Sequence, residues 1–269
     1  MDKQYYFISG LPRSGSTLLS AILKQNPDFY ADIASPVSTI VQSTIDVVSN
    51  SYNNVNFQED RRKDLLHSIF DGYYKSIEKS IIFDSERTWL SHTHLLKILY
   101  PKTKILVCVR DIRWILDSFE LIVSNNALYT NIFIGDYEVN QSVETRSAAL
   151  MDVGKDGQII KPWYWLREGL AANPDMIHII EYDDLTQDPE RTMKLVYDFL
   201  GMPYFNHDFN NVEYVNEYFD RTMGQPGLHT VKKKVEYKNR KSILPDTVWE
   251  KYKDMEFWRK PAKKDFSYG

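Results

Sequence analysis

Apolar positions along the chain fall into short unbroken runs separated by longer stretches with helical spacing. Runs typical of β-strands occupy residues 4–9, 80–85, 104–109 and 176–182, with a fifth candidate at 29–33. These runs are nearly continuous in apolar residues, which is typical of strands buried on both faces of a parallel sheet. The pattern therefore predicts a central sheet of about four to five parallel strands.

Helical spacing of apolar residues fills the stretches between these runs. The expected helices cover residues 18–23, 37–48, 65–77, 91–99, 113–124, 143–151, 162–172 and 189–200. We expect Ser35 to cap the second helix with Pro36 at its first position, and Gly201 to end the last. Strands that alternate with helices predict an α/β fold of three layers, with helices on both faces of the parallel sheet.

No linker, internal repeat or low-complexity tract divides the chain. We therefore expect a single domain over residues 1–269, with an irregular C-terminal segment from about residue 210. Residues 125–141 are predicted to form a long loop that could serve as a lid or a substrate rim.

Charge and cysteine content narrow the classes of function. The 269 residues carry a net charge of −4, so no overall positive field indicates nucleic-acid binding. The single cysteine, Cys108, excludes an intrachain disulfide and a two-cysteine metal site. No window approaches the roughly 18 apolar residues of a membrane span, and the first residues lack a signal-peptide pattern. We therefore expect a cytoplasmic protein without a membrane span.

The stretch GLPRSGST, residues 10–17, joins the first predicted strand to the first predicted helix. Gly10 and Gly15 let backbone N–H groups turn toward one point, where a helix N-terminus adds partial positive charge. Arg13 adds a planar cation, and three hydroxyls can donate to an oxyanion: Ser14, Ser16 and Thr17. The glycine spacing is that of a P-loop, but Ser16 stands where nucleotide-hydrolysing loops carry lysine. The pattern favours an anion-binding site over an ordinary polar turn. It also favours an anion smaller than a metal-bound triphosphate.

A second basic strand end follows in KILVCVRDIRWILDSFE, residues 104–120. Arg110 ends a buried strand, and Ser118 lies about two turns into the next predicted helix. Because ligands of open α/β sheets bind at the carboxyl ends of the strands, we expect Arg13 and Arg110 to face one crevice. The alternative is that Arg110 pairs with Asp111 or Asp84 for structural reasons.

These two segments resemble the nucleotide-binding motifs of one enzyme family. GLPRSGSTLL resembles the 5′-phosphosulfate loop of sulfotransferases that use 3′-phosphoadenosine 5′-phosphosulfate (PAPS), and VRDIRWILDSF resembles their 3′-phosphate motif. IIEYDDLTQDPERTMKLVYDFLGMPY, residues 179–204, resembles a further stretch of the family. The likeness extends over residues 6–235 and is greatest to bacterial sulfotransferases, while the opening is also similar to tyrosylprotein sulfotransferases. The resemblance implies a P-loop-like fold and PAPS as co-substrate.

The resemblance also implies roles for individual residues. The 5′-phosphate and sulfuryl group would contact Arg13, Ser14, Gly15, Ser16 and Thr17, and the 3′-phosphate would contact Arg110 and Ser118. Tyr182 would lie near the adenine, although a packed aromatic residue is an equal alternative. In RTMGQPGLHTVKKKV, residues 221–235, a loop that closes on the 3′-phosphate would include Gly227, Lys232 and Lys233. The alternative for these lysines is a solvated face.

Transfer of the sulfuryl group requires cations around it and a base for the acceptor. Arg13 would stabilise the leaving phosphate and Arg87, in FDSERTW, the transferring group, unless Arg87 pairs with Asp84 or Glu86. Asp32 is the preferred base by position in the sequence, and the alternatives are His92, His94 and His229. No residue set has metal-ligand spacing, so no metal is expected.

The sequence as a whole therefore predicts a PAPS-dependent sulfotransferase that acts on a hydroxyl or amine of a small molecule, glycan or lipid. Two other classes of function stay open at this point. One is a P-loop kinase-like transferase that uses ATP, which the missing lysine disfavours. The other is a non-catalytic nucleotide-binding protein. No pattern in the sequence indicates the oligomeric state.

Overall fold

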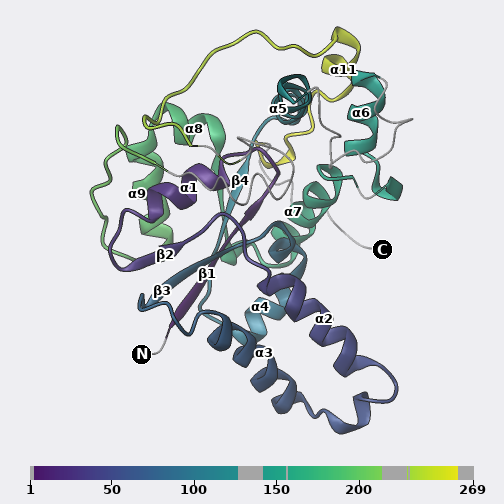
Figure 1. Cartoon of the computed structure of the whole chain (residues 1–269), viewed down its shortest axis with the longest axis vertical. Coiled ribbons are helices and arrows are strands. Elements are labelled where there is room, and N and C mark those ends of the chain that lie inside the picture. Colours follow the sequence, from purple (N-terminus) through teal and green to yellow (C-terminus); the bar gives the residue numbers. More distant parts are fainter. Residues whose placement is uncertain (1–2, 127–141, 156, 214–228, 230, 260–269) are drawn as a thin grey trace.

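The computed structural model describes residues 3–126, 142–155, 157–213, 229 and 231–259. Its centre is a sheet of five parallel strands in the order β2-β3-β1-β4-β5 (Figure 1). The strands are β1 (Gln4–Gly10), β2 (Phe29–Ala31), β3 (Ile81–Ser85), β4 (Ile105–Val109) and β5 (Ile177–Glu181). All five coincide with the apolar runs of the sequence, so the predicted α/β class and parallel sheet are confirmed.

Helices cover both faces of the sheet, which gives the three predicted layers (Figure 1). One face carries α1 (Ser16–Leu23), α8 (Tyr182–Gln187) and α9 (Pro189–Leu200). The other carries α2 (Val37–Ser49), α3 (Glu59–Tyr73), α4 (Thr93–Leu99), α5 (Ile112–Asn125) and α7 (Ile160–Ala172). The core of this second face also includes residues of α6 (Val143–Leu150) and α11 (Asp246–Lys251).

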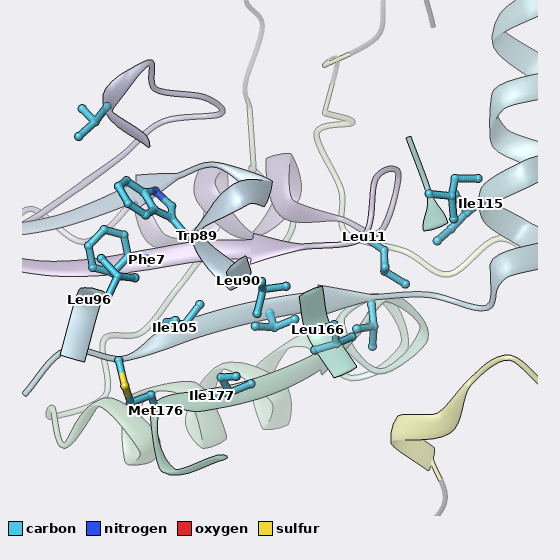
Figure 2. Close-up of a cluster of buried hydrophobic side chains, with 14 of the residues drawn as sticks. Phe7, Leu11, Trp89, Leu90, Leu96, Ile105, Ile115, Leu166, Met176 and Ile177 are labelled. Atoms are coloured by element: carbon cyan, nitrogen blue, oxygen red, sulfur yellow. The ribbon is translucent and has the colours of Figure 1, made fainter. Parts of the chain in front are cut away.

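The sheet separates two hydrophobic cores. Successive side chains of β1 point to opposite faces, so Phe7 belongs to the larger core and Ile8 to the smaller one. Figure 2 shows the larger core, where the ring of Phe7 lies 4.8 Å from that of Trp89. Each large side chain buried in this way contributes about 1.5–3 kcal/mol, which explains why the strands lack polar alternation.

Two helix starts differ from expectation. Pro36 takes the capping position of α2, while the Ser35 hydroxyl accepts the Val37 N–H at 3.1 Å. The single helix expected at residues 91–99 is divided into the 3-10 helix η2 (Arg87–His92) and α4. Gly201 ends α9 with φ 69°, as predicted.

Two short helices, α8 and α11, were not predicted. The C-terminal segment from about residue 210 was expected to be irregular, but it contains α11 and the 3-10 turn η6 (Phe257–Arg259). The expected loop at 125–141 lies almost wholly outside the described residues. Among the described helices, none is both long and apolar enough to cross a membrane.

Candidate functional site

A cleft of about 730 Å³ lies at the carboxyl ends of β1, β3 and β4. Three parallel strands that end side by side bring together segments distant in sequence. The cleft is lined by the loop after β1, the residues that follow β3 and β4, the start of α8, and the C-terminal stretch. The location is the one where open α/β sheets bind ligands.

The loop after β1 has left-handed backbone at three positions: Gly10 with φ 128°, Arg13 with φ 58° and Gly15 with φ 97°. A Cβ atom on Gly10 would lie 2.1 Å from the Cys108 carbonyl oxygen, so only glycine lets β1 and β4 approach this closely. A Cβ atom on Gly15 would lie 3.0 Å from the Tyr182 ring. Helix α1 begins at Ser16, so the N–H groups of its first turn lack partners within the helix.

The hydroxyl of Ser14 is used within the protein. It lies 2.8 Å from the Cys108 carbonyl and also contacts the Leu11 carbonyl, and the residue is only 1% exposed. This hydroxyl therefore fastens the loop to β4, and its contact with a bound anion stays a prediction. The side chains of Ser16 and Thr17 do line the cleft.

The two arginines expected to face one crevice do so. Arg13 and Arg110 both line the cleft, and an Arg110 Nη1 donates to the Arg13 carbonyl at 3.4 Å. The Arg13 Nε donates to the Ser118 hydroxyl at 3.1 Å, which joins the loop to α5. The phosphate-loop segment and the segment after β4 thus form one continuous wall.

Arg110 has an environment suited to an anion. Its guanidinium lies 4.1 Å from the centroid of the Tyr182 ring, and its buried Nε has no hydrogen-bond partner in the described part of the chain. Burial lowers the pKa of Arg110. The alternative pairing with Asp111 or Asp84 does not occur, because Asp111 binds Arg113 at 2.6 Å and Asp84 is saturated by other donors.

Arg87 follows β3 and reaches the same cleft. Its guanidinium forms no ion pair with any described carboxylate, and Glu86 accepts the Arg87 backbone N–H at 2.8 Å. Burial lowers the pKa of Arg87, and the nearby Glu86 charge partly offsets this effect. The alternative pairing of Arg87 with Asp84 or Glu86 is thus not formed, and the cation remains directed to the cleft.

The structure separates the candidate bases. Asp32, His92 and His94 are not among the cleft-lining residues. Asp32 accepts the Ile33 N–H at 2.8 Å, and both ring nitrogens of His92 lie within 2.9 Å of protein oxygens. His229 lines the cleft, and so does Glu86, which sequence reasoning missed. The signal for Glu86 was its position beside Arg87 at a strand end.

The consecutive lysines at residues 232–234 do not all line the cleft. Lys232 lines the cleft, whereas Lys233 does not and pairs with Glu213 at 3.7 Å. The role of Lys233 at a phosphate therefore stays a prediction, and Gly227 lies outside the described residues. Three further cations of the cleft were missed: Lys234, Lys238 and Arg240. Their even-numbered spacing in an extended chain was the available signal.

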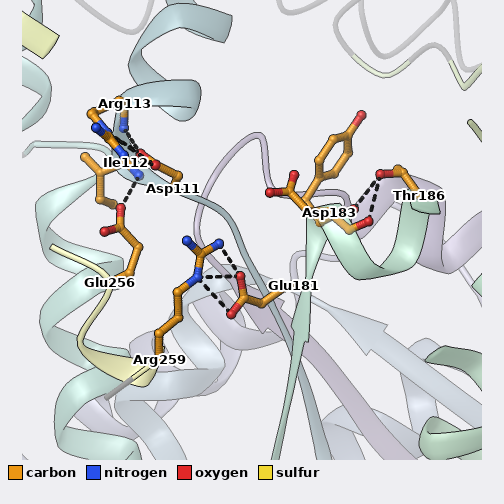
Figure 3. A network of polar contacts seen from close by, with 9 residues as sticks. Asp111, Ile112, Arg113, Glu181, Asp183, Thr186, Glu256 and Arg259 are labelled. Atoms are coloured by element: carbon orange, nitrogen blue, oxygen red, sulfur yellow. Dashed lines mark hydrogen bonds and ion pairs between the residues drawn. The ribbon is translucent and has the colours of Figure 1, made fainter. Parts of the chain in front are cut away.

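The C-terminal turn supports the outer side of the site (Figure 3). Glu256 accepts the Ile112 N–H at 3.2 Å, just beyond Arg110. Arg259 donates to Glu181 at 2.7 Å, just before Tyr182. The chain next to Arg110 and the chain next to Tyr182 are thus both tied to the C-terminal turn. No described group of three or more His, Cys, Asp or Glu residues is arranged to hold a metal ion.

Comparison with known proteins adds a family. The model of the family described as "Sulfotransferase family" matches residues 6–206. The protein-tyrosine sulfotransferase of Drosophila melanogaster is 24% identical over 224 residues, which cover 78% of this chain and 40% of that protein. The chain therefore spans less than half the length of this curated relative.

Solved structures share the fold. The sulfotransferase domain from the curacin biosynthetic pathway superposes with a TM-score of 0.53 at 17% identity, over 98% of this chain and 94% of that domain. A sulfotransferase from Alicyclobacillus acidocaldarius gives a TM-score of 0.50 at 16% identity, over 77% of this chain and 85% of that one.

Proposed function

Because the chain belongs to the sulfotransferase family, we propose that it transfers a sulfuryl group from PAPS to a hydroxyl or amine on a small molecule, glycan or lipid. One observation carries the proposal. Arg87 and Arg110 reach one cleft from different strand ends, and neither forms an ion pair with a described carboxylate. Half-buried cations without an ion-pair partner are costly unless a ligand supplies the counter-charge.

The donor fits the cleft by its charges. The loop N–H groups, the hydroxyls of Ser16 and Thr17, and Arg13 receive the 5′-phosphate and the sulfuryl group. Arg110 and Ser118 receive the 3′-phosphate, and Tyr182 contacts the adenine. The support for this order is the distance of 3.4 Å between an Arg110 Nη1 and the Arg13 carbonyl, which brings both anion-binding groups within reach of one nucleotide. The absence of the P-loop lysine disfavours Mg²⁺-ATP.

The reaction is an in-line displacement at sulfur. The acceptor oxygen or nitrogen forms a bond to sulfur as the bond from sulfur to the 5′-phosphate oxygen breaks, and adenosine 3′,5′-bisphosphate leaves with the bonding electrons. Arg13 stabilises the charge that develops on the leaving phosphate. Arg87 stabilises the oxygens of the transferring group.

The acceptor proton passes to a base that lines the cleft, and among the candidate bases Glu86 and His229 meet this condition. Glu86→Gln and His229→Gln separate them. The variant that loses transfer while it still binds adenosine 3′,5′-bisphosphate identifies the base.

Calorimetry with adenosine 3′,5′-bisphosphate tests the donor, with Arg110→Ala as the variant. We expect affinity to fall about 10- to 100-fold, because the variant loses a charge-assisted hydrogen bond to phosphate. Absence of binding to the unmodified protein at millimolar ligand would end the proposal. Stronger thermal stabilisation by Mg²⁺-ATP would instead support a kinase-like enzyme.

Labelled PAPS tests transfer against a panel of phenols, glycans, lipids and tyrosine peptides. We expect label on at least one acceptor, and loss of that label with Arg13→Ala. Nucleotide binding without transfer to any acceptor, and with PAPS hydrolysis unchanged in Arg13→Ala, would identify a non-catalytic nucleotide-binding protein.

A further inference from the structure

The cleft is crossed by an extended stretch, residues 231–240, which we call the basic segment. Figure 1 shows the C-terminal chain (yellow) running across the top of the molecule from the side of α8 and α9 to α11. Seven residues of the basic segment line the cleft: Val231, Lys232, Lys234, Val235, Glu236, Lys238 and Arg240. The basic segment therefore presents four cations to the cleft, beside one carboxylate and two apolar residues.

These cations lie close to one another. The like charge of the nearby Lys238, together with burial, lowers the pKa of Lys232. Glu236 contacts Lys238 at 2.9 Å and neutralises only part of the charge. Two ammonium groups that converge on a cleft are favourable when an anion lies between them.

The basic segment is fixed at two points. At its start, the Lys233 carbonyl accepts the Val212 N–H at 2.7 Å and the Val235 N–H donates to the Phe209 carbonyl at 2.8 Å. After Val235, residues 236–242 form no backbone–backbone hydrogen bond within the described parts of the chain. The second fixed point is therefore made by side chains.

Asp117 makes this second point. Its carboxylate is 0% exposed and accepts from Ser242 Oγ at 2.7 Å and from the Ile243 N–H at 2.9 Å. Arg240 also donates to it, while the Arg240 guanidinium lies 5.0 Å from the centroid of a Trp114 ring. Three donors from residues 240–243 thus converge on one buried oxygen pair of α5.

The neighbour of Asp117 on α5 faces the nucleotide side. Ser118 lines the cleft and accepts from Arg13 at 3.1 Å. Adjacent residues of one helix therefore fix the two walls of the cleft: Ser118 contacts the phosphate-loop wall, and Asp117 holds the opposite wall.

We propose that Asp117 is a positioning residue that holds the basic segment across the cleft, so that its lysines meet a phosphate group of the bound nucleotide. The inference rests on the proposed function for the identity of the ligand. Without the anchor, residues 236–242 would have to be ordered on binding, which costs conformational entropy for each long side chain immobilised. The loss therefore falls on affinity for the nucleotide and not on the chemical step.

Asp117→Asn tests the proposal, because it keeps the shape and removes the charge that holds Arg240. We expect the Kd for adenosine 3′,5′-bisphosphate and the KM for PAPS to rise about tenfold, the effect of about 1.4 kcal/mol, with kcat unchanged within twofold. Lys241→Ala is the matched control, because Lys241 is an exposed cation of the same stretch that does not line the cleft. It should bind as the unmodified protein does.

Limited proteolysis gives a readout that needs no nucleotide. Trypsin cleavage after Lys232, Lys234 and Lys238 should be about tenfold faster in Asp117→Asn, because local opening is easier. Cleavage at Lys63 on α3 is the internal reference and should not change. If Asp117→Asn does not fold, Ser242→Ala removes one donor and should give a smaller change in the same direction.

The outcomes separate the two proposals. If the unmodified protein fails to bind adenosine 3′,5′-bisphosphate, the proposed function and this inference both fall. If the unmodified protein binds and Asp117→Asn binds equally well, only this inference falls. A fall in kcat with unchanged KM and Kd would also overturn it, because that pattern assigns Asp117 to the chemical step.

Discussion

Asp84 and Arg87 lie three residues apart at the end of β3, yet their surroundings are opposite. Asp84 is 0% exposed and accepts from Ser35 at 2.7 Å, Tyr74 at 2.6 Å and Trp89 at 2.7 Å. Arg87 reaches the cleft without an ion-pair partner among the described carboxylates. One charged group is saturated by the protein and the other is not.

The short segment at the end of β3 thus serves both stability and function. Burial raises the pKa of Asp84, while its three donors favour the charged form. These donors tie together the segment before α2, the residue after α3, and η2. Burial likewise lowers the pKa of Arg87, and the nearby Glu86 charge offsets this only in part, without forming an ion pair. A saturated group stabilises the protein, whereas an unsaturated group at a cleft indicates a ligand site.

The largest effect is expected for Arg87→Met. We expect kcat for sulfuryl transfer to fall about 10²- to 10³-fold, as when one donor to a developing charge is removed. Thermal stability should stay unchanged or rise, because a buried cation without a partner is replaced by an apolar side chain. Transfer assays and thermal unfolding measure both effects. A clear loss of stability would show that Arg87 is structural after all.

Asp84→Ala should give the reverse result. Its three donors would be left unsatisfied, so the free energy of unfolding should fall by about 3 kcal/mol, measured by denaturant titration. Activity per folded molecule should change little, because Asp84 does not line the cleft. Asp84→Asn is the control and should lose less, since one amide oxygen can still accept. A stable Asp84→Ala variant with low activity would contradict the division of roles.

Glu256 extends the comparison to pH. Burial and then the neighbouring Asp111 raise the pKa of Glu256, so the folded state holds this proton more tightly than the unfolded state. Its stabilising contribution is therefore present below the ordinary glutamate pKa and is lost as pH rises through the raised value. Glu256→Gln cannot ionise, and we expect its Tm to exceed that of the unmodified protein by about 2–4 °C at pH 7.5.

The excess stability of Glu256→Gln should disappear toward pH 4, where Glu256 is protonated and therefore neutral like the glutamine of the variant. Thermal scans across this range measure it. A difference in Tm that does not vary with pH would mean that the carboxyl pair is not responsible.

The smallest expected effect concerns the two neighbouring lysines. Lys232→Ala should weaken binding of adenosine 3′,5′-bisphosphate about three- to fivefold, as expected for one partly screened cation. Lys233→Ala should change it by less than twofold, because Lys233 points to Glu213. Calorimetry at low salt compares them. Equal effects would show that both lysines act only through the overall charge.

Much of the cleft could be predicted because its parts are local in sequence. The loop from Gly10 to Thr17 and the pair of Arg110 and Ser118 each lie within one strand and the helix that follows it. The meeting of Arg13 and Arg110 then followed from parallel strands that end at one edge. Asp117 was missed because its importance depends on partners that no local pattern indicates, whereas Glu86 was missed although it stands beside Arg87 at a strand end.

The amino-acid sequence by itself determined the five strands, the helical layers and the phosphate-type loop, because unbroken apolar runs and glycine spacing act over a few residues. Only the tertiary structure decided which charges face the cleft. Lys232 lines the cleft and Lys233 does not, because side chains of an extended chain alternate in direction. The Ser14 hydroxyl is bound within the protein, unlike that of Ser16, because the Cys108 carbonyl of β4 lies next to it. Likewise, Asp84 is satisfied and Arg87 is not because the donors to Asp84 come from three other elements. Hydrogen bonds between distant segments decide which of these side chains are bound within the protein, and only packing brings such segments together.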